Sequence, residues 1–572
     1  MSTTLITGGT VVTATGRSEA DVLIDGETIV GVLNPGSVLL GSDLASSVDH
    51  VIDAKGKYVI PGGVDAHTHM ELPFGGTAAS DTFETGTRAA AWGGTTTIID
   101  FAVQTFGQKV MDGLAAWHAK AAGNCAIDYA FHQIIGEVND DSLAAMKKLP
   151  DEGISSFKLF MAYPGVFMSD DAQIFKAMQV SADTGMMTMM HAENGPVIDV
   201  IVKQLLAQGK TDPYYHGVAR AWQMEEEATH RAIMLANLTG APLYVVHVSA
   251  KQAVEQLAAA RDIGQNVFGE TCPQYLYLSL EEQLGAESAE WGKFEGAKWV
   301  CSTPLRSKAE GHQHHMWQSL RTNDIQMVST DHCPFCMKGQ KDLGLGDFSK
   351  IPNGIGSVEH RMDLLYQGVV DGQISLERWV EITSTTPARM FGLYGKKGVI
   401  QPGADADIVI YDPNGHTSIG YGEGKTHHMN MDHSAWEGFE IDGTSTSCSR
   451  GARSWSTTTS TSAPRATASS SSAASRSTSS STLAGRVARS AYRDQPPPVS
   501  IRPPAYSTNR KSSRCNSEQF SRPTRRHRAR STSPGRRRAR ARRDRTRDRS
   551  HWRKRSGPWA ARRDRNRRRG CT

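Results

Sequence analysis

The pattern of hydrophobic and polar positions changes twice along the chain. In residues 1–60, apolar and polar residues alternate between glycine-rich turns, as in LITGGTVVTATG and ADVLIDGETIVGV, and this alternation predicts β-strands. From residue 61 to about residue 390, short β-rich runs such as TTTIIDFAV alternate with alanine-rich stretches such as GLAAWHAKAAG, which predict helices. The segment GVIQPGADADIVIYDPN, after residue 390, returns to the strand pattern.

The central region predicts a barrel. Repeated strand–helix units imply a parallel sheet, and about eight units in this length favour a (β/α)8 TIM-like barrel over an open doubly wound sheet. An open sheet usually carries a glycine-rich phosphate loop, and neither GxGxxG nor GxxxxGK[ST] follows a predicted strand. We therefore predict an α/β fold with a (β/α)8 barrel at residues 61–390. Residues 1–60 and 391–443 are expected to form one small β-sandwich domain beside it.

The chain from residue 444 to residue 572 differs in composition from the rest. It holds 34 Lys and Arg but only 5 Asp and Glu, a net charge of +29, whereas residues 1–443 hold 30 basic and 54 acidic residues, a net charge of −24. The overall charge of +5 therefore describes neither part. Serine, threonine and arginine dominate residues 444–572, and such a segment cannot bury enough apolar surface to offset its chain entropy. We predict a disordered basic tail.

Two origins of this tail are considered. The first is a frameshift, because arginine dominates and only Lys511 and Lys554 are lysines, as expected for out-of-frame reading of GC-rich codons. The second is an evolved arm that binds nucleic acid. We favour the frameshift, and in either case a basic peptide would make nonspecific contacts with nucleic acid.

Other features of the sequence narrow the class of protein. No run of about 18 apolar residues is present, so we expect no membrane span. The start MSTTLITGGTVVTATG does not have the pattern of a secretory signal. The eight cysteines are scattered, which fits reduced thiols in the cytoplasm. Cys333 and Cys336 form a CxxC, but a structural zinc needs four ligands and no second pair accompanies them.

Five metal-ligand side chains stand at the ends of predicted strands. His67 and His69 end VIPGGVDAHTH, and residues i and i+2 of a strand point to the same face. His191, His247 and Asp331 end three further strands. Taken singly, each histidine is more simply a core or loop residue. Because the carboxyl ends of barrel strands converge on one site, the five together predict a centre for zinc or a similar divalent ion.

Lys158 stands among apolar neighbours in the predicted strand SSFKLFMA. A buried ammonium without a partner is unfavourable, so a lysine at this position needs a reason. A lowered pKa would make the amine nucleophilic, able to form a Schiff base or to add CO₂, and the resulting carbamate could bridge two metal ions. The alternative, a lysine that extends to the barrel rim, remains open on spacing alone.

Nine segments together resemble a known family. In chain order they are VIPGGVDAHTHMELPFGGT, GISSFKLFMAY, MMHAENG, LYVVHVSA, GETCPQYL, VSTDHCPF, KIPNGIGSVEHR, GADADIVIYDP and HHMNMDHSAWEG. They are similar to the dihydropyrimidinase, or D-hydantoinase, family of cyclic amidohydrolases in the amidohydrolase superfamily. The resemblance runs from residue 1 to about residue 443.

The resemblance implies two divalent metal ions, with Zn²⁺ favoured. By that resemblance, His67, His69 and Asp331 bind one ion, and His191 and His247 bind the other.

The resemblance also implies the roles of further residues. Lys158, as N6-carboxylysine, would bridge the two ions together with a hydroxide. The Tyr163 hydroxyl would face the developing oxyanion, and backbone groups of Ser302 and Asn353 would hold the cyclic amide. Asp331 is suited to carry the proton to the leaving nitrogen.

The implied reaction is hydrolytic ring opening of 5,6-dihydropyrimidines, 5-substituted hydantoins, or both, to N-carbamoyl amino acids, as in pyrimidine catabolism. The alternatives are an allantoinase-like or dihydroorotase-like hydrolase, or a non-catalytic scaffold that resembles dihydropyrimidinases. All six metal-ligand positions are intact, which argues against the scaffold.

Substrate choice has one indicator in the sequence. Dihydroorotases place an arginine after the histidine pair to bind the substrate carboxylate, and this chain has Glu71 there. An acidic residue would repel a carboxylate, so a neutral ring is favoured. Met70, Leu72, Phe160 and Phe167 are candidates for lining the pocket around the ring substituent, although ordinary packing explains each of them equally well.

The family continues past FEIDG with further strands and a C-terminal arm that contacts other subunits. We expect a homo-oligomer, which the resemblance implies to be a tetramer. After residue 443, however, this chain has a different sequence in place of the family's C-terminal arm, so the contact made by that arm is not expected here.

Overall fold

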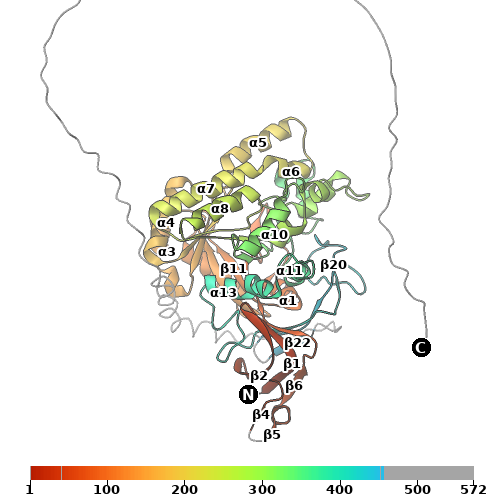
Figure 1. Cartoon of the computed structure of the whole chain (residues 1–572). Helices are drawn as coiled ribbons and strands as arrows, with labels where there is room; N and C mark the ends of the chain where they lie inside the picture. Colours follow the sequence, from red (N-terminus) through yellow and green to blue (C-terminus); the bar gives the residue numbers. More distant parts are fainter. Residues whose placement is uncertain (1, 40–41, 451–452, 457–572) are drawn as a thin grey trace, which may run out of the picture. The chain divides into compact units, whose positions relative to one another are not determined.

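Eight parallel strands form the centre of the structure, a computed structural model that describes residues 2–39, 42–450 and 453–456 (Figure 1). Each strand pairs with the next one along the chain. The strands are β8 (Gly63–Thr68), β11 (Thr95–Val103), β12 (Asp128–Ile134), β13 (Ser156–Phe160), β14 (Met187–His191), β15 (Leu243–Val245), β16 (Val267–Thr271) and β17 (Met327–Val328).

The first and last strands meet where the chain leaves β17. An isolated parallel bridge joins Thr68 to His332, and the backbone N–H of His69 donates to the carbonyl of His332 at 2.8 Å. These contacts bring the two edges of the eight-stranded sheet together and close it into a barrel. The predicted (β/α)8 barrel is therefore confirmed.

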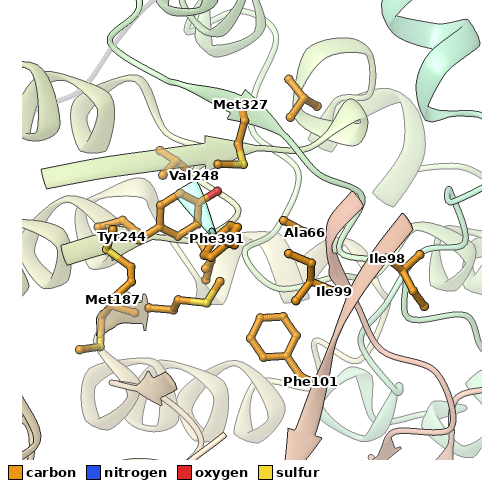
Figure 2. Close-up of a cluster of buried hydrophobic side chains, with 14 of the residues drawn as sticks. Ala66, Ile98, Ile99, Phe101, Met187, Tyr244, Val248, Met327 and Phe391 are labelled. Atoms are coloured by element: carbon orange, nitrogen blue, oxygen red, sulfur yellow. The ribbon is translucent and has the colours of Figure 1, made fainter. Parts of the chain in front are cut away.

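Strands of the barrel are buried on both faces. All nine residues of β11 and all six of β8 are buried, as expected for parallel strands that helices cover on the outside and side chains fill on the inside. Figure 2 shows part of this core, including Ala66, Phe101, Tyr244 and Phe391. The centroid of the Phe101 ring lies 4.7 Å from that of His67.

Helices connect the strands and cover the barrel, and α4, α7 and α8 pack side by side on its outside (Figure 1). Helix α4 begins with a capping box in which Asp170 accepts from the N–H of Gln173, and it ends at Gly185 with a left-handed φ of 75°. Within the described residues, no helix combines the length and apolar composition that a membrane span requires. The α-helices are α1 (Phe83–Trp92), α2 (Val110–Ala121), α3 (Asp140–Met146), α4 (Asp171–Thr184), α5 (Gly195–Ala207), α6 (Tyr214–Ala219), α7 (Trp222–Thr239), α8 (Lys251–Asp262), α9 (Pro273–Tyr277), α10 (His312–Thr322), α11 (Arg361–Val370), α12 (Leu376–Val380) and α13 (Thr386–Met390).

Short helical turns and two-stranded pairs lie in the connections. The turns are η1 (Leu44–Ser47), η2 (Leu149–Glu152), η3 (Leu280–Leu284), η4 (Lys293–Trp299), η5 (Lys341–Gly344), η6 (Phe348–Lys350) and η7 (Glu381–Thr385). The paired short strands are β4 (Val38–Leu39) with β5 (Ser42–Asp43), β9 (Pro73–Phe74) with β10 (Thr77–Ala78), and β19 (Thr417–Ser418) with β20 (Glu440–Ile441).

A second sheet combines strands from the two ends of the described chain, as the sequence predicts. Its order is β22-β21-β18-β7-β1-β2-β3, with β6 beside β1, and β7 antiparallel to β18 joins the N-terminal strands to the C-terminal ones. The strands are β1 (Thr3–Thr13), β2 (Gly16–Asp25), β3 (Thr28–Leu33), β6 (His50–Asp53), β7 (Tyr58–Pro61), β18 (Ile408–Asp412), β21 (Thr444–Arg450) and β22 (Arg453–Ser456).

This sheet continues past residue 443, where we predicted that the tail begins. Strand β21 pairs antiparallel with β18, and Cys448 is fully buried. Low-complexity composition concealed the strand, because serine and threonine also suit a half-buried strand when a buried partner is already in place. The rest of the predicted tail, residues 457–572, lies outside the described residues.

Candidate active site

Every metal-ligand candidate of the sequence comes to the carboxyl end of the barrel. His67 lies in β8 and His69 just after it, while Asp331 follows β17 on the other side of the barrel closure. His191 ends β14 and His247 follows β15. A pocket of about 470 Å³, including its open mouth, lies among them, and Lys158 of β13 also lines it.

Three donor atoms of one group converge. The Nε2 atoms of His67 and His69 are 3.2 Å apart, and Asp331 Oδ1 lies 3.1 Å from the first and 3.2 Å from the second. All three residues are buried, and together they could hold a metal ion. Two imidazoles and a carboxylate are a donor set that zinc accepts.

The hydrogen bond on the far side of His67 explains why a cation suits this group. His67 Nδ1 contacts the Glu270 carboxylate, and Glu270 in turn accepts from the Tyr244 hydroxyl at 2.7 Å. A proton on Nδ1 leaves a lone pair on Nε2, which faces the carboxylate oxygen of Asp331. Burial and the Lys158 ammonium lower the pKa of His67, but the Glu270 and Asp331 carboxylates outweigh them and raise it. The arrangement therefore favours a positive charge among these atoms, and a divalent ion provides it.

A second donor pair lies beside the first group. His191 Nδ1 and His247 Nε2 are 2.9 Å apart, and the ring centroids of His67 and His247 are separated by 5.6 Å. His191 Nε2 bonds Glu193 Oε2 at 2.9 Å, which leaves Nδ1 as the free donor atom. Burial lowers the pKa of both histidines, so both are neutral and able to act as ligands.

Lys158 lies next to both groups. Its Nζ is 2.9 Å from His67 Nε2 and 4.4 Å from the ring centroid of Phe101, and the side chain is only 1% exposed. Burial lowers the pKa of Lys158 to about 8, although Asp331 and Glu270 act in the opposite direction. The lysine does not extend to the rim, so the alternative left open by its spacing is wrong.

Tyr163, Ser302 and Asn353 face the same pocket. The Asn353 Nδ2 donates to Ser302 Oγ at 2.9 Å, and hydrogen bonds with both residues reach the Tyr163 hydroxyl. Burial raises the pKa of Tyr163 to about 12, so the hydroxyl keeps its proton and can donate. The guanidinium of Arg220 lies 5.5 Å from the centroid of the Tyr163 ring.

Backbone strain is concentrated at this site. Among the described residues, five non-glycine residues have a positive φ, and Tyr163, His247 and Asp331 are three of them, with φ of 66°, 41° and 51°. Such conformations typically cost about 1–3 kcal/mol each and persist where the surroundings fix them. Their coincidence with pocket residues indicates a functional site.

Two expectations about the pocket are wrong. Met70 does not line it, because its side chain packs into the core against Gly86. Glu71 also points elsewhere: its carboxylate lies 3.5 Å from Lys120 Nζ. Glu71 itself has a left-handed φ of 56°, at the point where the chain turns after the histidine pair. The other three candidates, Leu72, Phe160 and Phe167, do line the pocket.

Sequence reasoning missed the residues that orient the ligands. Glu270 and Glu193 hold His67 and His191, and Arg220 Nη1 donates to Glu193 at 2.8 Å. A carboxylate in an otherwise apolar strand, as in NVFGETCP, was a signal for Glu270. Cys333 lines the pocket as a free thiol rather than as a structural zinc ligand.

Comparison with known proteins agrees with this geometry. The model of the amidohydrolase family matches residues 58–444. D-hydantoinase of Streptomyces coelicolor is 60% identical over 442 residues, which cover 77% of this chain and 92% of that protein. D-hydantoinase of Geobacillus stearothermophilus is 48% identical over 444 residues, covering 77% of this chain and 90% of that protein. The crystal structure of dihydropyrimidinase from Brevibacillus agri, 46% identical, superposes with a TM-score of 0.73 over 78% of this chain and 94% of that one. The chain therefore belongs to the amidohydrolase family, in the group of the D-hydantoinases and dihydropyrimidinases.

Proposed function

We propose that this protein hydrolyses cyclic amides, namely 5,6-dihydropyrimidines and 5-substituted hydantoins, to N-carbamoyl amino acids. One observation carries the proposal: donor side chains from the ends of four strands converge around Lys158 of a fifth strand, in a chain that is 60% identical to a D-hydantoinase. A non-catalytic scaffold would have no need for this converged donor set.

Two divalent ions, which we propose to be zinc, would be held at this site. His67, His69 and Asp331 would bind one ion, and His191 and His247 the other, with carboxylated Lys158 between them. When bound, such ions supply Lewis acidity and a nucleophilic water near neutral pH. The proximity of Lys158 Nζ to His67 and its lowered pKa support the carboxylation, because only the neutral amine adds CO₂.

The protein residues would then perform the remaining tasks. Asp331 takes a proton from the attacking water and delivers it to the leaving ring nitrogen. The Tyr163 hydroxyl donates to the oxyanion as the amide carbon becomes tetrahedral. Within the described residues, no hydrogen bond engages the backbone N–H of Ser302 or the carbonyl of Asn353. This donor and acceptor match the C=O and N–H of a cyclic amide.

The pocket walls support a neutral ring with an apolar substituent. Leu72, Phe74, Phe160 and Phe167 line it, and the described lining includes no arginine that could bind a substrate carboxylate. A dihydroorotase reaction is therefore disfavoured by the pocket lining, and not by Glu71, whose carboxylate lies beside Lys120.

Ring opening tests the proposal directly. The purified protein is incubated with dihydrouracil, with both enantiomers of a 5-monosubstituted hydantoin, with dihydroorotate and with allantoin, and the loss of cyclic-amide absorbance is followed. We expect activity on the first two, about two zinc ions per chain, and loss of activity on chelation. A protein that retains its metals but opens none of these rings would overturn the proposal, and preference for dihydroorotate or allantoin would favour the corresponding alternative.

We further propose that the protein is a cytoplasmic homo-oligomer. Exposed valines on α5 and α6, Val197, Val200 and Val218, support a contact between subunits. Light scattering of the purified protein measures the number of subunits.

The described cysteines are free thiols, which supports a reducing compartment. Contact of the tail with nucleic acid is inferred from its charge alone.

A further inference from the structure

Lys341 is a buried lysine that the proposed chemistry does not use. It begins η5, is 0% exposed, and does not line the pocket. Its Nζ donates to three backbone carbonyls: Val300 at 3.0 Å, Pro352 at 3.2 Å and Gly354 at 2.9 Å. All three N–H bonds of the ammonium are thereby used.

The three carbonyls belong to the two loops that carry Ser302 and Asn353. Val300 precedes Ser302 by two residues, and Pro352 and Gly354 flank Asn353 on both sides. Because Lys341 binds the carbonyls on either side, the carbonyl of Asn353 is the one left for a ligand. The loops are also tied directly, since the N–H of Gly354 donates to the Val300 carbonyl at 2.9 Å.

The surroundings allow little freedom in this arrangement. A Cβ at Gly354 would lie 2.0 Å from the Cys333 carbonyl, so the loop passes too close for any other residue. On the second loop, the carbonyl of Cys301 bonds His216 Nε2 at 2.9 Å. The N–H of Ser302 belongs to the same peptide unit and therefore points away from His216.

A buried lysine at this position carries a desolvation cost, which its three hydrogen bonds offset. The electrostatic partners that face it are the thiols of Cys301 and Cys333, and burial lowers the pKa of Lys341 to about 7. An apolar side chain of similar length would avoid the desolvation of an ammonium. What the ammonium provides and an apolar residue does not is a fixed direction for three carbonyls in two loops.

We propose that Lys341 is a positioning residue for substrate binding: by binding the carbonyls of Val300, Pro352 and Gly354, it sets the spacing and direction of the Ser302 N–H and the Asn353 carbonyl. This proposal rests on the proposed function, in which those two groups hold the cyclic amide. Lys341 itself does not touch the substrate.

Steady-state kinetics of Lys341→Met tests the proposal. Loss of the three hydrogen bonds should raise KM about tenfold or more, with a smaller change in kcat, because the amide-binding groups lose their alignment. Zinc content should equal that of the wild type, since Lys341 contacts no metal-ligand candidate. Lys341→Gln, which keeps two donors, should show an intermediate KM, and it also provides the comparison if the methionine variant does not fold.

Lys397→Met is the matched control. Lys397 is also a buried lysine, but its Nζ contacts Asp405 and Asp407 at 3.1 and 2.7 Å, away from the pocket residues. We expect this variant to lower Tm and to leave KM unchanged. If Lys341→Met or Lys341→Gln loses Tm in the same way with a wild-type KM, Lys341 is only structural and the proposal is overturned. A metal-loaded wild type that opens no ring would instead contradict the proposed function.

Discussion

Lys158 is the residue on which most of the proposed chemistry depends, since it lies between two groups of candidate metal ligands and is shielded from water. Its amine contacts His67 at 2.9 Å, and the aromatic rings of Phe101 and Phe160 surround it. An uncompensated ammonium at this place would repel a divalent ion, whereas a carbamate would bind it. The charge of this one side chain therefore decides whether the two donor groups can be filled together.

Replacing Lys158 by alanine is expected to abolish turnover and to lower the zinc content, because the proposed bridging carboxylate would be lost. Short carboxylates such as acetate or propionate, added with zinc, should restore part of the activity by occupying the same space. Metal analysis and ring-opening rates measure both effects. Wild-type rates in Lys158→Ala without any addition would contradict a bridging role.

Tyr163→Phe tests a donor to the oxyanion. The ring contacts with Phe160 and His191 remain in this variant, and only the hydroxyl is lost. We expect kcat to fall about 10²–10³-fold, the usual effect of removing one such donor. Tyr277→Phe is the control, because this hydroxyl donates to the Leu364 carbonyl of α11 at 2.6 Å, outside the pocket. Equal kcat values for the two variants would argue against a role in the reaction.

At the scale of single residues, the ligand candidates could be predicted from their spacing in the sequence. The residues that hydrogen-bond to those candidates could not. The i, i+2 spacing of His67 and His69 places both on one face in any strand. Glu270 reaches His67 only through the order of strands around the barrel, which no local pattern reveals. The prediction that Glu71 faces the substrate was wrong for a similar reason. Its backbone is left-handed, and its carboxylate lies beside Lys120.

Among the elements, α11 and β18 share a buried carboxylate that has no role in the pocket. Asp363 of α11 is 5% exposed and accepts from the Tyr411 hydroxyl of β18 at 3.0 Å. Burial raises the pKa of Asp363 to about 7, above the value of 3.8 in an unfolded chain. Between these two pH values the folded protein keeps a proton that the unfolded chain has released. The contribution of this group to stability is therefore complete below pH 3.8 and falls as the pH rises toward 7.

Asp363→Asn should remove this dependence, because the amide oxygen still accepts from Tyr411 but does not ionise. We expect the free energy of unfolding of the variant, relative to wild type, to increase between pH 5 and pH 7, at about 1.4 kcal/mol per pH unit at most. Chemical denaturation at several pH values measures this difference. The exposed Asp442→Asn serves as the control, and parallel curves for Asp363→Asn and wild type would show that the buried carboxyl does not titrate in this range.

The number and type of elements could be predicted because parallel strands and helices have distinct hydrophobic patterns over many residues. Their ends were harder to predict. Strand β21 is built from TSTSCSR, and its one apolar residue, Cys448, is buried in the sheet together with Ser445. Its pairing partner, β18, lies more than thirty residues earlier, and a local pattern does not contain that information.

For the whole molecule, charge separates the catalytic body from the basic C-terminal sequence. A chain ending after Ser456 should keep the zinc content and the ring-opening rate, since every pocket residue precedes residue 354. The full chain, but not the shortened one, should bind RNA at low salt, and log K should fall linearly with log salt concentration. Filter binding at several salt concentrations measures this. Equal binding by both chains would place the RNA contact on the acidic body instead.

Closure of the barrel has a consequence for the order of events during synthesis. The first donor group takes His67 and His69 from the beginning of the barrel and Asp331 from its last strand, and the bridge between Thr68 and His332 is what brings them together. A ribosome must therefore release more than 260 residues after the histidine pair before the three candidate ligands of the proposed metal site can come together. We therefore expect metal binding at this group to occur late in synthesis. A nascent fragment that ends before Asp331 lacks one of the three candidate ligands.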